Sequence, residues 1–331
     1  MIRAAVIGGS GYIGGELLRL LWMHPEVEIM AVTSRKYEGK RVEVVHPHLR
    51  GTGLRFSRKI SGDYDMLFLS VPHGESQKII EEYMGSVKII DLSADFRLPQ
   101  DVYEKYYGTH ERPELIDRFA YGLPELHREE IKKADYVANP GCNATAVILA
   151  LYPFRDMARD AMADVKVSSS AGGKKENLMG MHAERSNVVR VYRAWKHRHE
   201  GEIFVQTGVR CPLTIHSVDI VRGVFATVYF HADTNEISLY RRMYEVYRDE
   251  IFVKIVRERN GIERYPDVKY VIGSNYVHIG ATYDAESRRV ILFSAIDNLI
   301  KGGAGQAIQN MNLMFGLAED TGLKYLPLYP A

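Results

Sequence analysis

The chain has 331 residues, of which 46% are hydrophobic and 26% charged, and its formal net charge is +1. This length predicts two domains, and so small a net charge gives no reason to expect a nucleic acid or a membrane as a partner. No apolar run approaches the ~20 residues that span a bilayer, and the N-terminus leaves no room for a signal peptide. Two cysteines exclude a disulfide framework, so we expect a cytoplasmic protein.

The first third of the chain alternates apolar runs with a helical pattern. Strands are predicted at 3–9, 28–34, 65–71 and 87–93, and residues 12–24 have apolar spacing of helical period. Such alternation is typical of a parallel, doubly wound α/β sheet.

The later part of the chain predicts a different sheet. Strands are expected at 201–209, 223–232, 274–283 and 288–296, with polar loops between them. This pattern suits an antiparallel or mixed sheet with one covered face. Two helices complete the prediction, at 235–251 and at 300–320, and the second is long enough to return to the first domain.

A glycine-rich turn links the first strand to the first helix. Its pattern is Gly-x-Gly-x-x-Gly, in which glycine lets the backbone turn sharply and approach a pyrophosphate, while the helix N-terminus adds free N–H groups and partial positive charge. The residues expected to bind a dinucleotide are Gly9, Ser10, Gly11, Tyr12, Ile13 and Gly14. The alternative is a tight turn that holds no ligand.

The end of the second strand indicates which dinucleotide binds. NAD enzymes of this kind place an acidic residue there for the ribose 2′-hydroxyl, whereas this chain has Ser34, Arg35 and Lys36. A hydroxyl and two cations suit a 2′-phosphate, which a carboxylate would repel. We therefore expect NADP as the cofactor; the alternative is a solvated run of charges.

The segment NPGCNATAVI, residues 139–148, places Cys142 directly after a turn and at the start of a helical pattern. At a helix N-terminus the dipole and the free N–H groups stabilise a thiolate, which is the nucleophilic form. The turn also ends a strand at the carboxyl edge of the sheet, where such folds bind ligands, so we expect a catalytic thiol. The alternative, a small buried residue, is what we expect for Cys211, which precedes a proline in extended backbone.

A thiol beside NADP indicates redox chemistry between an acyl group and an aldehyde. Attack of the thiolate on an activated acyl group gives a thioester, which a hydride reduces to a thiohemiacetal and then to the aldehyde. The reaction needs a proton donor and acceptor, for which histidine is suited near pH 7. Candidates among the twelve histidines are His197, His199 and His216, and their spacing alone does not choose among them.

Seven motifs, in chain order, resemble those of a known family. They are GGSGYIGGELLRLL, SVPHGES, DLSADFRL, YGLPEL, NPGCNATA, HRHEGEI and DNLIKGGAGQA, and they run from about residue 3 to 316. The sequence resembles the N-acetyl-γ-glutamyl-phosphate reductases, which are relatives of aspartate-semialdehyde dehydrogenase. The resemblance implies a Rossmann NADP-binding domain joined to an α+β catalytic domain, and NADPH-dependent reduction of an acyl phosphate to a semialdehyde.

The resemblance also implies roles for individual residues. Cys142 falls on the family's nucleophile, and His216, six residues before Arg222, falls on its acid–base histidine, although the family often has Pro-His-Leu there. Arg97 falls where relatives bind the leaving phosphate, and Asn298 where the family meets the cofactor. Three following glycines, Gly302, Gly303 and Gly305, either admit the cofactor or only pack closely. The expected domains are 1–141 with 300–331, for NADP, and 142–299, for catalysis and oligomerisation as a dimer or tetramer.

One region between residues 174 and 199 is unusually basic, with seven cations and two acids. The cations are Lys174, Lys175, Arg185, Arg190, Arg193, Lys196 and Arg198, and the acids are Glu176 and Glu184. This stretch resembles the archaeal and Thermus-type branch of the family, which reduces 2-aminoadipyl or glutamyl phosphate carried on a small acidic amino-group carrier protein, in lysine or arginine biosynthesis. We therefore expect an acidic carrier as partner; the alternative is a solvated face.

Other functions stay open on the sequence alone. A free N-acetyl-γ-glutamyl phosphate is the nearest alternative substrate, and aspartyl phosphate is a more distant one. A Cys-His acyltransferase without hydride transfer would leave the glycine turn and the basic triad unexplained. An NADP-binding sensor would not need Cys142. The histidines and cysteines lack the ligand spacing of a zinc site, so no metal is expected.

Overall fold

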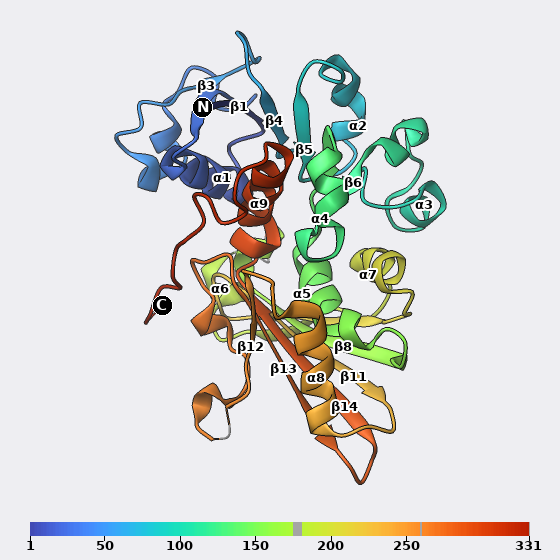
Figure 1. Ribbon diagram of the computed structural model, residues 1–331. Coiled ribbons are helices and arrows are strands. Elements are labelled where there is room, and N and C mark those ends of the chain that lie inside the picture. The colour runs from blue at the N-terminus through green and yellow to red at the C-terminus, as the bar shows by residue number, and fades with distance from the viewer. Residues whose placement is uncertain (175–180, 259, 331) are drawn as a thin grey trace. The chain divides into compact units, whose positions relative to one another are not determined.

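The structure is a computed structural model that describes residues 1–174, 181–258 and 260–330. The chain divides into two units (Figure 1). The first comprises Met1–Pro140 and Gly303–Lys324, and the second comprises Gly141–Gly302 and Tyr325–Ala331. The expected division placed residues 325–331 in the first unit, but residues 325–330 group with the second, where the backbone N–H of Leu328 donates to Ile272 O at 2.8 Å.

The first unit contains a seven-stranded sheet in the order β3-β2-β1-β4-β5-β7-β6. Its strands are β1 (Ile2–Ile7), β2 (Val27–Thr33), β3 (Phe56–Ser57), β4 (Met66–Leu69), β5 (Lys88–Asp91), β6 (Ala120–Tyr121) and β7 (Tyr136–Ala138). All the pairings are parallel, as the sequence predicts. The accompanying helices are α1 (Tyr12–Met23), α2 (Ser76–Ile79), α3 (Gln100–Tyr107), α4 (Pro124–Lys133) and α9 (Gly305–Met314).

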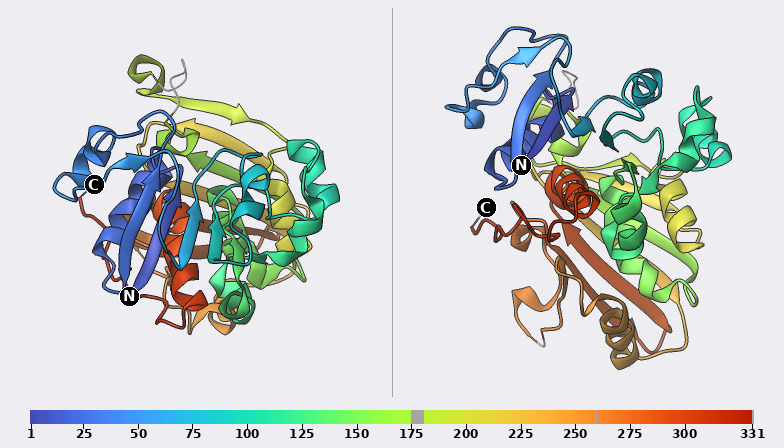
Figure 2. Two further views of the ribbon diagram at one scale, coloured as in Figure 1. Left: turned by 90° about the horizontal axis from the view of Figure 1, so that it is seen from above. Right: turned by 45° about the horizontal axis from the view of Figure 1, so that its top comes forward.

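Burial on both faces explains why the strands of this sheet are continuous apolar runs in the sequence. All four residues of β4 have no exposed surface, because helices cover both faces of a parallel sheet. Helix α9, which comes from the end of the chain, packs against α1 and α4 of the same unit (Figure 2). The strand order changes direction beside β1, so the carboxyl ends of β1 and β4 form the edge where doubly wound folds bind ligands.

The second unit contains a seven-stranded mixed sheet in the order β12-β13-β14-β11-β8-β10-β9. Its strands are β8 (Arg159–Val167), β9 (Val189–Arg193), β10 (Leu213–Val218), β11 (Val224–His231), β12 (Val253–Ile255), β13 (Val277–Asp284) and β14 (Arg289–Ile296). Its helices are α5 (Cys142–Leu151), α6 (His182–Arg185), α7 (His199–Thr207) and α8 (Glu236–Tyr247). Helices α5 and α8 pack on the sheet (Figure 1). Strands β8 and β10 alternate buried with more exposed residues, as a sheet with one covered face requires.

One expected strand, at 201–209, is wrong. These residues form helix α7, which ends at Gly208 in the left-handed conformation (φ 72°). Ile203 is fully buried, whereas Phe204 and Val205 are exposed. A short apolar run of this kind does not distinguish a strand from a helix by periodicity alone.

The expected final helix at 300–320 is shorter and less regular than the sequence indicates. It opens with a π-helical turn at Ile300–Ala304 and continues as α9 to Met314. Asp297 Oδ1 accepts the backbone N–H groups of Leu299 and Ile300 at the start of the turn. Among the residues that the structure describes, no helix is long and apolar enough to cross a membrane.

Candidate active site

The glycine turn between β1 and α1 is closely packed behind the position where a phosphate would lie. A Cβ at Gly14 would stand 2.8 Å from Gly9 Cα, and one at Gly9 would collide with Val32. Gly8, which the fingerprint leaves out, has φ +84°, and a Cβ there would collide with the carbonyl of Ser70. Only glycine fits these positions, so the backbone can fold tightly enough to expose its N–H groups to an anion.

The N-terminus of α1 itself is open. Gly11 is the N-cap, and neither a capping side chain nor an acidic residue occupies the first turn. A Cβ at Gly11 would meet no described heavy atom within 4 Å. The residues present therefore fit a dinucleotide pyrophosphate, with backbone N–H groups at the positive end of the helix dipole.

The residues after β2 continue this site within the first unit. Ser34 is buried, and its hydroxyl donates to Ser10 Oγ at 3.3 Å, which ties the end of β2 to the glycine turn. Arg35 is 86% exposed and lies 3.9 Å from the Glu75 carboxylate. Lys36 Nζ lies 5.5 Å from the centroid of the Tyr37 ring. Two cations thus follow a buried hydroxyl at the position that selects between the two dinucleotides.

The second unit holds the thiol. Cys142 is the first residue of α5, as the sequence predicts, and Gly141 is the N-cap. The Cys142 thiol is partly exposed and donates to Asn143 Oδ1 at 3.6 Å. Gly302 closes one side, because a Cβ there would lie 2.6 Å from Cys142 Cβ. The close packing that was one alternative for this glycine is therefore present.

Helix α7 closes the other side of the same turn. A Cβ at Gly141 would collide with His199 Nε2 and would stand 2.9 Å from Glu202 Oε1. Glu202 Oε2 accepts the Gly141 N–H at 3.0 Å. A histidine and a carboxylate, both almost fully buried, therefore lie against the residue that precedes Cys142.

The histidine chosen from the family resemblance lies in another setting. His216 is on β10, and its Nδ1 is 2.9 Å from Asp164 Oδ1 on β8. Asp164 also forms an ion pair with Lys166 at 3.1 Å. In the second unit, His199 lies against Gly141, the residue before Cys142. The acid–base role of His216 stays a prediction.

His197 and Cys211, which the sequence analysis also considered, are both buried. Burial, with a smaller contribution from Arg198 and Arg193, lowers the pKa of His197 to about 3, so this histidine stays neutral. Cys211 is 2% exposed, and burial, aided by Glu200, raises its pKa to about 12. The expected structural role of Cys211 fits these surroundings.

Arg97 lies against the backbone of its own unit just before Pro140. It is only 7% exposed, and its guanidinium donates to the carbonyl oxygens of Asn139, at 2.6 Å, and Leu92, at 3.0 Å. Asn139 in turn donates to Gly303 O at 3.2 Å. The guanidinium therefore fixes the backbone just before Pro140, and its expected role in binding the leaving phosphate stays a prediction.

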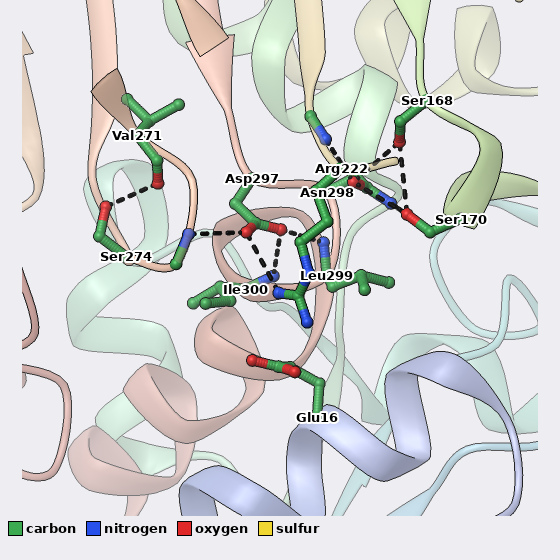
Figure 3. A network of polar contacts seen from close by, with 12 residues as sticks. Glu16, Ser168, Ser170, Arg222, Val271, Ser274, Asp297, Asn298, Leu299 and Ile300 are labelled. Atoms are coloured by element: carbon green, nitrogen blue, oxygen red, sulfur yellow. Dashed lines mark hydrogen bonds and ion pairs between the residues drawn. The ribbon is translucent and has the colours of Figure 1, made fainter. Parts of the chain in front are cut away.

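Asn298 is buried in a polar network of the second unit (Figure 3). Its Oδ1 accepts from Ser168 Oγ at 3.0 Å and from the Gly223 N–H at 2.7 Å, and its Nδ2 donates to Ser170 at 3.0 Å. These bonds use the amide to hold the loops after β8 and before β11. The expected contact with the cofactor stays a prediction.

The basic stretch reaches the surface at one edge of the second sheet. Lys175 and Glu176 lie outside the described residues, and β9 is the edge strand. All five of its residues are exposed, including Arg190, Arg193 and, at 80%, Val189. Exposed Lys196 and Trp195 follow the strand. Cations and apolar side chains therefore share one accessible edge.

Comparison with known families decides the class of this protein. Residues 3–134 match the family model described as "Semialdehyde dehydrogenase, NAD binding domain", and residues 142–298 match "Semialdehyde dehydrogenase, dimerisation domain". The chain belongs to the semialdehyde dehydrogenase family. It is therefore an oxidoreductase whose first unit is a nicotinamide-dinucleotide-binding domain, and the second match supports assembly into oligomers.

Relatives of known name refine the placement within this family. A protein of Pyrococcus furiosus, named putative [LysW]-L-2-aminoadipate/[LysW]-L-glutamate phosphate reductase, is 64% identical over 330 residues and covers 100% of both chains. The [LysW]-L-2-aminoadipate/[LysW]-L-glutamate phosphate reductase of Sulfurisphaera tokodaii is 44% identical over 351 residues, again with 100% of both chains covered. The family resemblance drawn from the seven motifs is confirmed.

Solved structures confirm the fold. Aspartate semialdehyde dehydrogenase II of Vibrio cholerae, complexed with ASA, matches with a TM-score of 0.71 at 17% identity, covering 96% of this chain and 98% of the other. The aspartate semialdehyde dehydrogenase of Candida albicans, solved with NADP, matches with a TM-score of 0.68 at 14% identity, covering 97% and 99%. The expected doubly wound domain with a second α+β domain is therefore correct.

Proposed function

We propose that this enzyme reduces 2-aminoadipyl phosphate, glutamyl phosphate or both, attached to an acidic carrier protein, to the semialdehyde, with NADPH as the reductant and release of phosphate. The reaction serves lysine or arginine biosynthesis in the cytoplasm. The observation that carries the proposal is the setting of Cys142, at a helix N-terminus between Gly302 and the His199–Glu202 pair, in a chain 64% identical along its whole length to a relative of that name.

Cys142 performs the covalent step. Its thiolate attacks the carbonyl carbon of the acyl phosphate; a carbon–sulfur bond forms, the bond from carbon to the phosphate oxygen breaks, and phosphate leaves with the electron pair. NADPH, when bound, supplies the hydride that reduces the resulting thioester. The carbon–sulfur bond then breaks, which releases the aldehyde and restores the thiolate. The helix dipole at α5 stabilises the thiolate before and after the reaction.

His199 is the better supported acid–base group. Its ring lies against Gly141, one residue before the nucleophile, whereas His216 is engaged with Asp164. As an imidazolium, His199 gives a proton to the oxygen that gains charge when the thioester is reduced, and it takes the proton back when the thiohemiacetal collapses. His199→Asn and His216→Asn separate the two assignments, since only the first should lose about 10²–10⁴-fold in kcat.

NADP fits the first unit better than NAD. The glycine turn and the open α1 N-terminus would hold the pyrophosphate. Ser34, Arg35 and Lys36 would hold the 2′-phosphate, because they offer one hydroxyl and two cations where NAD enzymes place an acid.

The edge formed by β9 is the proposed platform for the carrier. Arg190 and Arg193 lie on the strand, and Lys196 follows it, all exposed. Paired β9 edges of two copies would bring like charges together, which disfavours a second copy of this chain at this edge. A negatively charged partner is favoured for the same reason.

The second sheet offers a separate face for assembly. Val224, Ala226 and Val228 of β11 are fully buried, whereas Phe225 and Tyr229, which alternate with them, are half-buried and point to the opposite face. Such an apolar, partly uncovered face, together with the match to a dimerisation domain, supports at least a dimer. Light scattering of the wild-type protein and of Tyr229→Asp would measure it, with a smaller mass expected for the variant.

The test of the function runs the reaction backwards, because acyl phosphates are unstable. Phosphate, NADP⁺ and a semialdehyde are supplied, and NADPH formation is followed. The semialdehyde on an acidic carrier is compared with the free N-acetyl semialdehyde at equal concentration. Cys142→Ser is the control for the nucleophile. Arg190→Glu/Arg193→Glu tests the platform, and exposed Arg241→Glu, on α8, is its matched control.

Each outcome has a definite meaning. Turnover that needs the carrier, and falls about tenfold in the β9 double variant while Arg241→Glu stays unchanged, supports the whole proposal. Equal or better turnover of the free N-acetyl compound makes the enzyme an N-acetyl-γ-glutamyl-phosphate reductase and β9 an ordinary surface. No turnover of either, from folded protein that binds NADPH, would overturn the acyl-phosphate chemistry.

A further inference from the structure

A buried histidine that the proposed reaction does not use lies against the glycine turn of the first unit. His46 is only 4% exposed, and its Nε2 is 2.9 Å from the carbonyl oxygen of Gly9. A carbonyl oxygen only accepts hydrogen bonds, so Nε2 carries a proton and donates it to this bond. Nε2 can donate from the neutral ring and from the protonated ring, so the bond does not depend on the charge of His46.

The same ring also packs against the first helix. A Cβ at Gly15 would stand 2.5 Å from Nδ1 and Cε1 of His46, so only glycine leaves room for the imidazole. Gly15 lies inside α1, where alanine is otherwise favoured over glycine by about 1 kcal/mol. The histidine therefore explains a glycine that the helix itself disfavours.

The segment that carries His46 is anchored by apolar side chains. Val42 and Leu49 are buried, and His46 stands between two short helical turns, Val42–Val44 and Pro47–Leu49. The N–H of His46 donates to Val42 O, and its carbonyl oxygen accepts the Leu49 N–H, each at 2.9 Å. The ring therefore reaches the glycine turn from a backbone that is held on both sides.

The bond to Gly9 fixes the orientation of one peptide group in the turn. The Gly9–Ser10 peptide is trans, and in a planar trans peptide the C=O and N–H groups point in opposite directions. Because His46 holds the Gly9 carbonyl, the Ser10 N–H points away from His46. Thr33 holds the preceding part of the turn, since its Oγ1 and its carbonyl oxygen accept the N–H groups of Gly8, at 3.3 Å, and Gly9, at 3.0 Å.

We propose that His46 is a positioning residue for the cofactor, which directs the Ser10 N–H toward the pyrophosphate by holding the carbonyl at the other side of the same peptide. This inference rests on the proposed function, in which this turn binds NADPH. A backbone N–H directed at a phosphate binds it, whereas a carbonyl oxygen rotated into the same place would repel it. In this role His46 acts through the turn and needs no contact with the phosphate.

His48 provides a matched control. It lies two residues further along the same segment, it is exposed, and its ring centroid is 5.8 Å from that of His46. His46→Leu removes the donor and keeps an apolar side chain in the buried site. His46→Gln restores a donor, because its amide nitrogen can take the place of Nε2. Gly15→Ala keeps the histidine in the chain and displaces its ring.

The test measures NADPH binding by fluorescence titration. The Kd is expected to rise about tenfold in His46→Leu and in Gly15→Ala, as for the loss of one hydrogen bond to a charged group. It should rise less than about threefold in His46→Gln and stay unchanged in His48→Gln. In the reverse assay kcat at saturating NADP⁺ should be nearly constant, because the reacting residues do not move.

A second probe separates positioning of the turn from general damage to the first unit. 2′-AMP carries the 2′-phosphate of NADP but no pyrophosphate, so its Kd, measured by calorimetry, is expected to stay the same in all four variants. A purely structural role for His46 would lower the melting temperature and weaken both ligands together.

An unchanged Kd for NADPH in folded His46→Leu or Gly15→Ala would overturn the inference. An equal weakening of 2′-AMP would do the same, as would a loss in His48→Gln, or a loss in His46→Gln as large as that in His46→Leu. If one of the first two variants does not fold, the other decides by the same criteria. Wild-type protein that binds no NADPH would instead contradict the cofactor of the proposed function.

Discussion

Helices α1 and α5 begin alike and face different surroundings. Each has a glycine N-cap with φ −77°, no capping side chain and no acidic residue in its first turn. At Gly11 a Cβ would meet no described atom within 4 Å, whereas at Gly141 it would collide with His199. The open terminus leaves its N–H groups for an anion from outside, and the enclosed one has its anion, Glu202, built in.

The difference shows that a helix N-terminus acquires its chemistry from the segments packed around it. The same partial charge can hold a diphosphate or stabilise a thiolate. What decides is whether neighbouring segments leave space, as at α1, or fill it with titratable groups, as at α5. Four predictions test this contrast, from the largest expected effect to the smallest.

The two cysteines should differ most. At pH 8 burial leaves Cys211, with its pKa raised to about 12, about 10³-fold less thiolate than an unperturbed cysteine, while Cys142 is partly exposed on a helix N-terminus. Iodoacetamide should therefore label Cys142 at least about 10³-fold faster, measured by peptide mass spectrometry. The small Cys211 rate should rise about tenfold per pH unit, because its thiolate fraction does so below the pKa.

Comparable labelling of both cysteines in folded protein would contradict this view of the enclosed terminus. Cys142→Ser serves as the control, since it should leave only the slow reaction. Addition of NADPH provides a second control, because the rate at Cys211 should not change with cofactor.

Gly141→Ala should cost the enzyme about 100-fold in kcat. The new methyl group would displace the His199 ring and Glu202 Oε1, and overpacking of a buried turn typically costs about 1–3 kcal/mol of stability as well. The reverse assay and a thermal melt measure the two effects. NADPH binding, which uses the first unit, should be unchanged; a variant with wild-type kcat would show that the close packing at Gly141 is not needed.

The contrast between the two termini also shows what the sequence could predict. The strand–glycine–helix turn at Gly9–Gly14 and the turn before Cys142 are local patterns, and both helix starts were predicted correctly. The parallel and mixed sheets followed from the spacing of apolar runs. Gly8 was not part of the predicted glycine pattern. Glycine is required there because φ is positive and a Cβ would collide with Ser70, which lies about sixty residues further along the chain.

The surroundings of Cys142 were harder to predict, because residues 201–209 were expected to form a strand and instead belong to helix α7 and its C-terminal end. If residues 201–209 were a strand, alternation extended back to His199 would place it and Glu202 on opposite faces. In the helix that forms, they are three residues apart and share a face. Arg97 and Asn298 show a second limit: a motif identifies residues that matter, but not whether they contact a ligand or, as their hydrogen bonds indicate, backbone.

Gly11→Ala should have a moderate effect and only on the cofactor. Its φ of −77° suits alanine, and no described atom is near enough to collide, so the melting temperature should stay nearly constant. The methyl group would stand where a phosphate approaches, and the Kd for NADPH should rise about tenfold, the equivalent of about 1.4 kcal/mol. A fluorescence titration with NADPH measures it. A fall in stability without a change in affinity would mean that the terminus is not open.

Arg35→Ala should have the smallest effect, because Arg35 is 86% exposed and exposed charge pairs contribute less than about 1 kcal/mol. KM for NADPH should rise about threefold to fivefold, and KM for NADH, which lacks the 2′-phosphate, should not change. Arg58→Ala is the matched control, since Arg58 is also exposed in the first unit and pairs with Glu38. The ratio of the two KM values is the decisive quantity: an equal rise for both cofactors would place Arg35 against the shared pyrophosphate, and no rise for either would leave the choice of NADP to Ser34 and Lys36.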